Sequence, residues 1–220
     1  MAEDDNHDHL NSSLTDLMTS LMVIFVLLLL TFVTRTAGKN AAVTDALLKV
    51  LKRELVPQGF RDQDIVQDKR DRNAILVVVP DQLMNFKLGE YQLRPEGEAF
   101  LQTHIPNMAK VLCGSEYRSS IESVIVEGHT DSNPYPNRTL EESENLNLKL
   151  SQDRSMEVVK ASLAVLNTLP EERACFLEML SASGRGEQDR QSTADESRRV
   201  IFKIRVRADQ ATTLRATVTQ

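Results

Sequence analysis

The first chemistry that this sequence suggests is ion transfer at a single carboxylate, Asp16. Asp16 lies in the stretch Ser13–Thr34, where the ten residues from Leu21 to Leu30 are apolar without a break. An acidic residue at the centre of a membrane-spanning helix costs roughly 2.5–3.5 kcal/mol, and less near its end, so such residues usually mark an ion or proton pathway. The alternative is that Asp16 caps the start of a helix by accepting hydrogen bonds from free N–H groups.

The stretch around Asp16 is long enough to cross a membrane. Residues 14–35 are expected to form a helix, which at about 1.5 Å per residue spans roughly the 30 Å of a bilayer core. Residues 1–13 contain four acidic and no basic residues, so a flexible tail and an uncleaved anchor are expected rather than a signal peptide. Arg35 and Lys39 follow the span, which weakly favours a cytoplasmic C-terminal part, although large domains cross regardless of this bias.

Three polar stretches further along the chain have residue types suited to ligand binding. They are Gly128–Asp131 after an expected strand, Asn147–Arg154 at the expected start of a helix, and Ser197–Val200 before the last expected strand. A purely structural role is also open, in which Asp131 and Asn147 cap helices and Arg154 forms a surface ion pair.

These stretches are carried by alternating strands and helices. Residues 36–58 are expected to form a juxtamembrane helix and linker that ends at Pro57 and Gly59. The fold class is α+β: a single N-terminal transmembrane helix followed by a domain of β-α-β-α-β order with a final strand, one sheet with helices on one face. The expected strands are 74–80, 119–127, 180–186 and 200–207, and the expected helices are 95–112, 147–169 and 171–177; a flexible tail is expected at 209–220.

Composition narrows the function classes. The chain of 220 residues has a formal net charge of −6 and no basic stripe, which argues against a nucleic-acid partner. It has no glycine-rich phosphate loop, and its four histidines have no metal-ligand spacing, so neither a cofactor nor a metal is expected. Cys113 and Cys175 can pair in an oxidising compartment or stay as two separate thiols, and their spacing does not decide between these.

In their order, the three polar stretches resemble the G-[HYF]-T-D, N-x-x-L-S-x-x-R and N-R-R-[VI] motifs of OmpA-like peptidoglycan-binding domains, and the domain is assigned to residues 59–208. The resemblance implies that Asp131 meets the ammonium of a diaminopimelate side chain and that Arg154 takes its carboxylate bidentately. Thr130 and Asn147 would add hydrogen bonds. Arg198 would also bind, although Ser197 stands where Asn is usual. The separation of Asp131 and Arg154 exceeds the usual one, and the extra residues lie in 132–145.

The stretch Thr15–Met22, TDLMTSLM, resembles the membrane helix of B subunits of ion-driven stators, of the MotB and PomB type and most closely the ZorB type of the Zorya anti-phage system. The resemblance implies a non-enzymatic subunit of the bacterial inner membrane, with a cytoplasmic N-terminus and a periplasmic domain. The B subunit would form a dimer inside a pentamer of MotA- or ZorA-like A subunits. Asp16 would carry protons, with sodium as the alternative ion. Other readings are a flagellar-type stator subunit and a static cell-wall tether.

Two further expectations follow from the anchor. Thr15, Thr19 and Ser20 have hydroxyls that could relay the ion, or that simply bond to the helix backbone. The helix 36–56 has an apolar face formed by Val43, Leu47, Val50 and Leu51, which would be wet in a lone chain. Pairing with a second copy would bury this face. The alternatives are that the face folds back on its own domain or lies on the lipid surface.

Overall fold

The computed structural model describes residues 4–84 and 86–207, with side chains described in 14–34, 42–84 and 86–207. Its contacts divide the chain into two compact units, one of residues 1–40 with 208–220, and one of Ala41–Arg207. The tail expected at 209–220 lies outside the described residues. The second unit begins at Ala41, so it includes residues that the sequence analysis places in a linker before a domain at residue 59.

The first unit contains most of helix α1, which runs from Asp4 to Leu55. Within it, Leu14–Thr34 has a mean hydropathy of 2.6 and none of its apolar window is buried, so by length and composition this stretch can span a membrane. The helix already includes residues 4–13, where a flexible tail was expected. Asp16 therefore lies well inside the helix, and the alternative that it caps the helix start is wrong.

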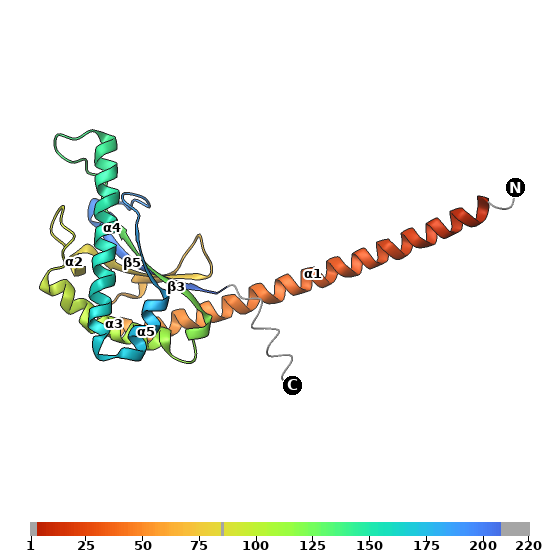
Figure 1. The fold of residues 1–220 in the computed structure, drawn as a ribbon, viewed down its shortest axis with the longest axis horizontal. Coiled ribbons are helices and arrows are strands. Elements are labelled where there is room, and N and C mark those ends of the chain that lie inside the picture. The colour runs from red at the N-terminus through yellow and green to blue at the C-terminus, as the bar shows by residue number, and fades with distance from the viewer. Residues whose placement is uncertain (1–3, 85, 208–220) are drawn as a thin grey trace. The chain divides into compact units, whose positions relative to one another are not determined.

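The second unit is built on a five-stranded sheet in the order β1-β2-β5-β3-β4, in which only β3 and β4 are parallel (Figure 1). The four expected strands are confirmed. The additional edge strand β1 is only three residues long, too short to leave an alternating pattern in the sequence. The strands are β1 (Ile65–Gln67), β2 (Ala74–Pro80), β3 (Ile121–His129), β4 (Leu180–Gly184) and β5 (Arg199–Val206).

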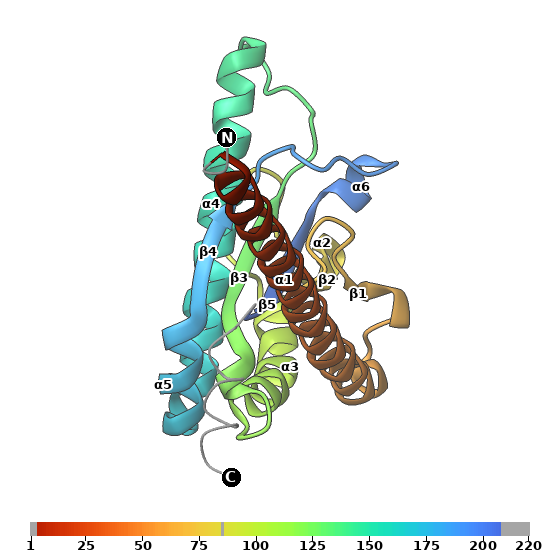
Figure 2. The same cartoon turned by 90° about the vertical axis from the view of Figure 1, so that its right-hand side faces the viewer.

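Apart from α1, the larger helices lie on one face of this sheet, as Figure 2 shows. The row Val77–Phe202–Val126, on neighbouring strands, is at most 1% exposed and forms the centre of the core beneath them. Pro106 lies inside α3, which continues through it as a single helix. The helices are α2 (Asp81–Met84), α3 (Pro95–Cys113), α4 (Leu140–Val165), α5 (Pro170–Met179) and α6 (Ala194–Ser197), with single 3₁₀ turns at Val56–Gln58, Asp62–Asp64, Arg118–Ser120 and Leu166–Thr168.

The end of α1 is part of the domain core. Thr44, Leu47, Leu51 and Leu55 recur at helical spacing and are all 0% exposed. The three leucines belong to the same apolar cluster as Ile105 of α3. The expectation that Leu47 and Leu51 pair with a second copy is therefore wrong, because the chain's own domain already buries them.

Cys113 at the end of α3 and Cys175 in α5 form a disulfide, with their Cα atoms 6.0 Å apart. Of the two possibilities left open by the sequence, the structure thus has the bonded one. The bond ties together α3 and α5 through two cysteines that are 62 residues apart in the chain. Such bonds persist in oxidising compartments and are rare in the cytosol.

Candidate functional site

The sheet topology brings three charged side chains together at one end of the strands. Strands β2 and β3 are both antiparallel to β5, so they run in the same direction and their C-terminal ends meet where β5 begins. Asp81 directly follows β2, Asp131 lies two residues after β3, and Arg198 directly precedes β5. The N–H of Asp81 also donates to the carbonyl of Arg198 at 3.2 Å, which joins these strand ends.

Helix α4 supplies the fourth charged residue, Arg154. The helix begins at Leu140 with a capping box between Thr139 and Glu142, so Asn147 lies about two turns inside it rather than at its start. The sequence expectation of a start at residue 147 is wrong, because the helix also includes residues 140–146, most of which belong to the insertion expected at 132–145. One buried face carries Ser143, Asn147, Ser151 and Arg154.

This face of α4 packs closely on the strand ends. A Cβ added to Gly128 of β3 would lie 2.2 Å from the backbone oxygen of Ser151, so only glycine permits the observed approach. The Ser151 hydroxyl accepts the N–H of Gly186 at 2.8 Å, and the N–H of Thr130 donates to the carbonyl of Gly186 at 2.8 Å. These contacts fix the position of α4 on the sheet, and with it the positions of Asn147 and Arg154 relative to Asp131.

Arg198 is the direct partner of Asp131. Its Nη1 donates to Asp131 Oδ2 at 2.6 Å, and its Nη2 pairs with Asp195. Its Nε lies 3.6 Å from Asp81 Oδ2. The other oxygen of Asp131 accepts the N–H of Asn133 at 3.0 Å. Burial alone would lower the pKa of the Arg198 guanidinium, but the hydrogen bond to Asp131 and the charges of Asp131, Asp195 and Asp81 together raise this pKa above its ordinary value.

Arg154 is buried, and its guanidinium is held by contacts with other parts of the domain. It is 3% exposed, and it donates from Nε to the carbonyl of Glu90 at 3.0 Å and from Nη2 to the carbonyl of Lys87 at 3.1 Å. Its guanidinium lies over the ring of Phe86, 4.8 Å from the centroid. Its Nη1 is 3.8 Å from Asp81 Oδ1. The alternative of a surface ion pair is therefore wrong.

Burial opposes the charges of both Arg154 and Asp81. Desolvation lowers the pKa of Arg154 despite the nearby carboxylates, and it raises the pKa of Asp81 despite Arg154 and Arg198. The mutual attraction of the pair does not fully offset the loss of water around it. Groups held at such a cost are typical of binding sites, where the charges serve a ligand rather than stability.

The structure brings all five residues expected at the wall-binding site into one region. Asp131 contacts Arg198, and Asp81 links Arg198 to Arg154. The Thr130 hydroxyl is buried and has no hydrogen-bond partner among the described residues. Asn147 is 4% exposed. Asp81 and Asp195 were not expected from the sequence, although Asp81 gives a signal: an acidic residue directly follows strand β2, and Asp131 comes two residues after β3.

The residues expected to carry ions belong to the other unit. Asp16, Thr15, Thr19 and Ser20 are all exposed in the structure. The Thr19 hydroxyl donates to the carbonyls of Thr15 and Asp16, at 3.0 and 2.9 Å. For Thr19 this is the local backbone bonding that the sequence left open as an alternative to an ion relay.

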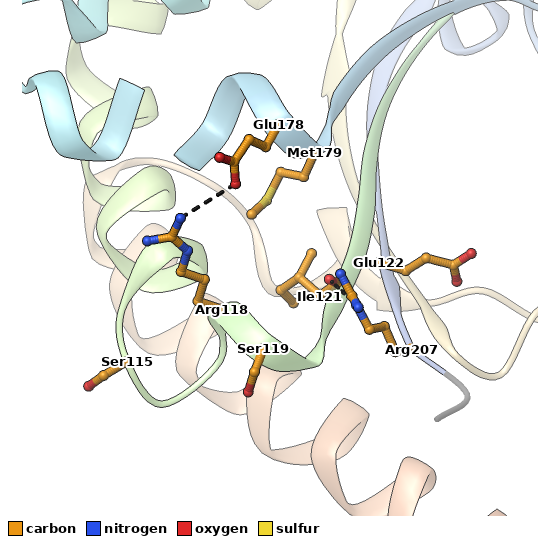
Figure 3. Close-up of a pocket in the computed structure, with 8 residues that line it drawn as sticks. All are labelled: Ser115, Arg118, Ser119, Ile121, Glu122, Glu178, Met179 and Arg207. Atoms are coloured by element: carbon orange, nitrogen blue, oxygen red, sulfur yellow. Dashed lines mark hydrogen bonds and ion pairs between the residues drawn. The ribbon is translucent and has the colours of Figure 1, made fainter. Parts of the chain in front are cut away.

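A cavity of about 420 Å³ lies at the far end of the sheet, where β3 begins and β5 ends (Figure 3). Figure 3 shows Arg118 beside Glu178, at an N–O distance of 3.4 Å, and Arg207, whose Nε donates to the carbonyl of Ile121 at 3.0 Å. The cavity contains none of the five residues expected to bind the wall. The candidate site around Asp131 lies at the opposite end of the sheet, where β3 ends and β5 begins.

The family model of the OmpA family matches residues 85–201, more than half of the chain. The chain belongs to the OmpA family. The match begins just before Phe86 and includes Asp131, Arg154 and Arg198. None of the curated proteins matches the chain.

Several solved structures are similar to this chain at low sequence identity. A MotB-like protein from Desulfovibrio vulgaris is 18% identical, with a TM-score of 0.55 over 77% of this chain and 98% of that one. The cell wall anchor of the T6SS from Pseudomonas aeruginosa is 22% identical, with a TM-score of 0.47 over 71% and 97%. The periplasmic domain of Helicobacter pylori MotB (residues 78–256) is 13% identical, with a TM-score of 0.47 over 70% and 96%. The similarity to the Desulfovibrio vulgaris protein supports the fold, in which an OmpA-like domain follows one apolar N-terminal helix in the chain.

Proposed function

We propose that this protein anchors a membrane complex to peptidoglycan through the cluster around Asp131. The observation that carries the proposal is a cluster of four charged residues at one end of the sheet: Asp81, Asp131, Arg154 and Arg198. Burial disfavours the charged forms of two of them, Asp81 and Arg154. A buried cluster with both signs of charge suits a ligand that itself carries both signs.

The ligand end that fits this cluster is the side chain of diaminopimelate, with an ammonium beside a carboxylate. Asp131 binds the ammonium, in exchange for Arg198, and Arg154 binds the carboxylate with the nitrogen that faces Asp81. The Thr130 hydroxyl and Asn147 add neutral hydrogen bonds. Arg198, once released from Asp131, is placed to hold Asp81 and Asp195.

We further propose that the domain is periplasmic and that the N-terminus is cytoplasmic, with Leu14–Thr34 in the inner membrane. The disulfide Cys113–Cys175 supports this orientation, because it is stable in an oxidising compartment and peptidoglycan lies there. The weak bias of Arg35 and Lys39 points the other way, but a domain of this size crosses regardless of it.

The finer proposal is that the protein is the B subunit of an ion-driven rotary motor, of the MotB-like class and specifically of the Zorya anti-phage type. The support is Asp16, a carboxylate well inside the apolar helix α1, with the motif around it. Such a charge needs other protein around it, which a pentamer of A subunits and a second B helix would supply. The coupling ion is the proton, with sodium as the alternative. A flagellar-type stator subunit and a static wall tether are the competing functions.

Wall binding is tested with the full chain in detergent micelles, mixed with purified diaminopimelate-type sacculi and sedimented. The wild type should sediment with the sacculi, and Asp131→Ala and Arg154→Ala should stay in the supernatant. The control is Arg190→Ala, which removes a 60% exposed arginine from the same domain and should bind as the wild type does. Equal sedimentation of all four proteins would place the wall-binding site elsewhere.

A further inference from the structure

Arg199 is a buried arginine that directly follows Arg198 and begins β5. It is 8% exposed and lies opposite His129 of β3. Gly128 packs against α4, and successive residues of a strand point to opposite faces, so His129 and Arg199 lie on the face of the sheet away from α4. A buried cation on this face needs hydrogen-bond partners there.

The partners of Arg199 are three backbone carbonyls of the segment that leads to Arg198. Its Nη1 donates to the carbonyl of Ser197 at 3.1 Å and to that of Glu196 at 3.3 Å. Its Nη2 donates to the carbonyl of Asp189 at 2.9 Å. A guanidinium carries five N–H donors in one plane, so a single side chain fixes both ends of this segment, residues 188–198.

The start of the 188–198 segment is held from two further sides. His129 Nδ1 lies 3.1 Å from the carbonyl oxygen of Gln188. The Asp189 carboxylate lies 2.5 Å from Arg70 Nη1, in the turn between β1 and β2. Asp189 has a φ of 59°, which is uncommon for residues other than glycine, so these contacts specify a backbone conformation that Asp189 would rarely adopt by itself.

The end of the segment is held by Ser197, which is 5% exposed. Its hydroxyl accepts the N–H of Gln191 at 3.0 Å and donates to the carbonyl of Thr193 at 2.8 Å. This end includes α6 with Asp195, and the N–H of Arg198 donates to the carbonyl of Ala194 at 3.1 Å. The backbone of Arg198 is therefore placed by the same segment that Arg199 binds.

We propose that Arg199 is a positioning residue of the wall-binding site, which holds the 188–198 segment so that Arg198 stays paired with Asp131 when no ligand is bound. The proposal rests on the function proposed above. Arg199 acts through Arg198, whose Nη1 donates to Asp131 at 2.6 Å. A looser segment lowers the effective concentration of the Arg198 guanidinium at Asp131, as a softer tether does, so the ligand ammonium displaces it more easily.

The test is a double-mutant cycle, with affinity for diaminopimelate-type sacculi measured by sedimentation of the full chain in detergent micelles. Arg199→Lys keeps the charge but cannot reach all three carbonyls, and it should bind about threefold more tightly than the wild type. In an Arg198→Gln background the same substitution should add nothing, because no guanidinium remains to be positioned. An effect on the fold alone would be equal in both backgrounds.

Ser197→Ala loosens the same segment without changing Arg199, and it should show the same dependence on Arg198. It supplies the cycle if circular dichroism shows that Arg199→Lys does not fold. The matched control is Arg205→Lys, on the same strand and face as Arg199 but paired with Asp71 at 3.0 Å, and it should bind as the wild type does.

Wild-type or weaker binding by folded Arg199→Lys overturns the positioning role while wall binding stands. An equal change in both backgrounds has the same consequence, because it shows that Arg199 does not act through Arg198. If the wild type does not sediment with the sacculi, both the proposed function and the role of Arg199 are overturned.

Discussion

Arg198 Nη1 lies 2.6 Å from Asp131 Oδ2, so the carboxylate that we propose for the ligand ammonium already has a cation of the protein itself as its partner. The two side chains are 23% and 11% exposed, respectively. Ligand binding at Asp131 therefore exchanges one cation for another. The ion pair with Arg198 neutralises Asp131 when no ligand is bound. Because the ligand must displace Arg198, it binds more weakly than it would bind to an unpaired carboxylate.

Replacing Arg198 should therefore strengthen wall binding. In Arg198→Gln the ligand ammonium no longer competes with an internal cation, and loss of a partly buried ion pair of about 1 kcal/mol corresponds to about fivefold tighter binding. Sedimentation with diaminopimelate-type sacculi over a range of protein concentrations measures the change. Weaker binding by Arg198→Gln would instead make Arg198 a direct ligand contact, as the family resemblance implies.

Arg154→Lys should abolish wall binding although it keeps the positive charge. Lysine lacks the planar fork that reaches the carbonyls of both Lys87 and Glu90, so at least one hydrogen bond from a charged group, worth about 1.5–3 kcal/mol, is lost. Binding to sacculi and urea unfolding give the two readouts. Arg190→Lys, at an exposed position, should be unchanged in both. Normal binding by Arg154→Lys would show that charge alone suffices.

Asp16→Asn should abolish motor function and leave membrane insertion intact. Asn keeps the size of the side chain but cannot take up and release a proton. Phage protection, or motility in a flagellar context, is the readout, together with co-purification of the A-subunit partner. Asp45→Asn removes an exposed carboxylate of the same helix beyond the span and serves as the control. Full activity of Asp16→Asn would exclude the ion-carrying role.

Reduction of the Cys113–Cys175 disulfide should destabilise the domain. The bond closes a segment of 62 residues, for which the chain-entropy model gives about 4 kcal/mol of stabilisation. Urea unfolding of the full chain, followed by circular dichroism with and without dithiothreitol, measures the loss. A Cys113→Ser/Cys175→Ser variant should match the reduced wild type and should not respond to dithiothreitol. An identical unfolding midpoint for oxidised and reduced wild type would contradict the expectation.

Acidification should lower the free energy of unfolding of the domain, in part because Asp68 becomes protonated. Burial alone would raise its pKa, but Lys203 at 2.7 Å and the N–H of Arg70 outweigh burial and hold the pKa below its ordinary value. Asp68 then stabilises the fold above the pKa of an unfolded aspartate, near 3.9, and this contribution is lost as pH falls through the folded-state pKa. In Asp68→Asn the free energy of unfolding should be lower at pH 7 and fall less on acidification below about pH 4. Parallel pH profiles for the two proteins would contradict this.

The elements that depend on local pattern could be predicted from the sequence. The β-branched run 74–80, the apolar periodicity that predicts the helix beginning at Pro95 and the final alternating strand were identified because hydrophobic period is a local property. The three polar motifs also predicted the five site residues that the structure brings into one region. The start of α4 was missed, since the capping box at Thr139 lies inside the stretch 132–145 that was expected to be an inserted loop.

Contacts between distant residues were decided only by the tertiary structure. Asp131 and Arg198 are 67 residues apart, and they meet because β2 and β3 flank β5 and end where it begins. The same strand order adds Asp81 to the site. The sequence determined that Leu47 and Leu51 must be buried, but not against what, because an apolar helix face specifies burial and not its partner. Only the packed domain shows that its own core covers them.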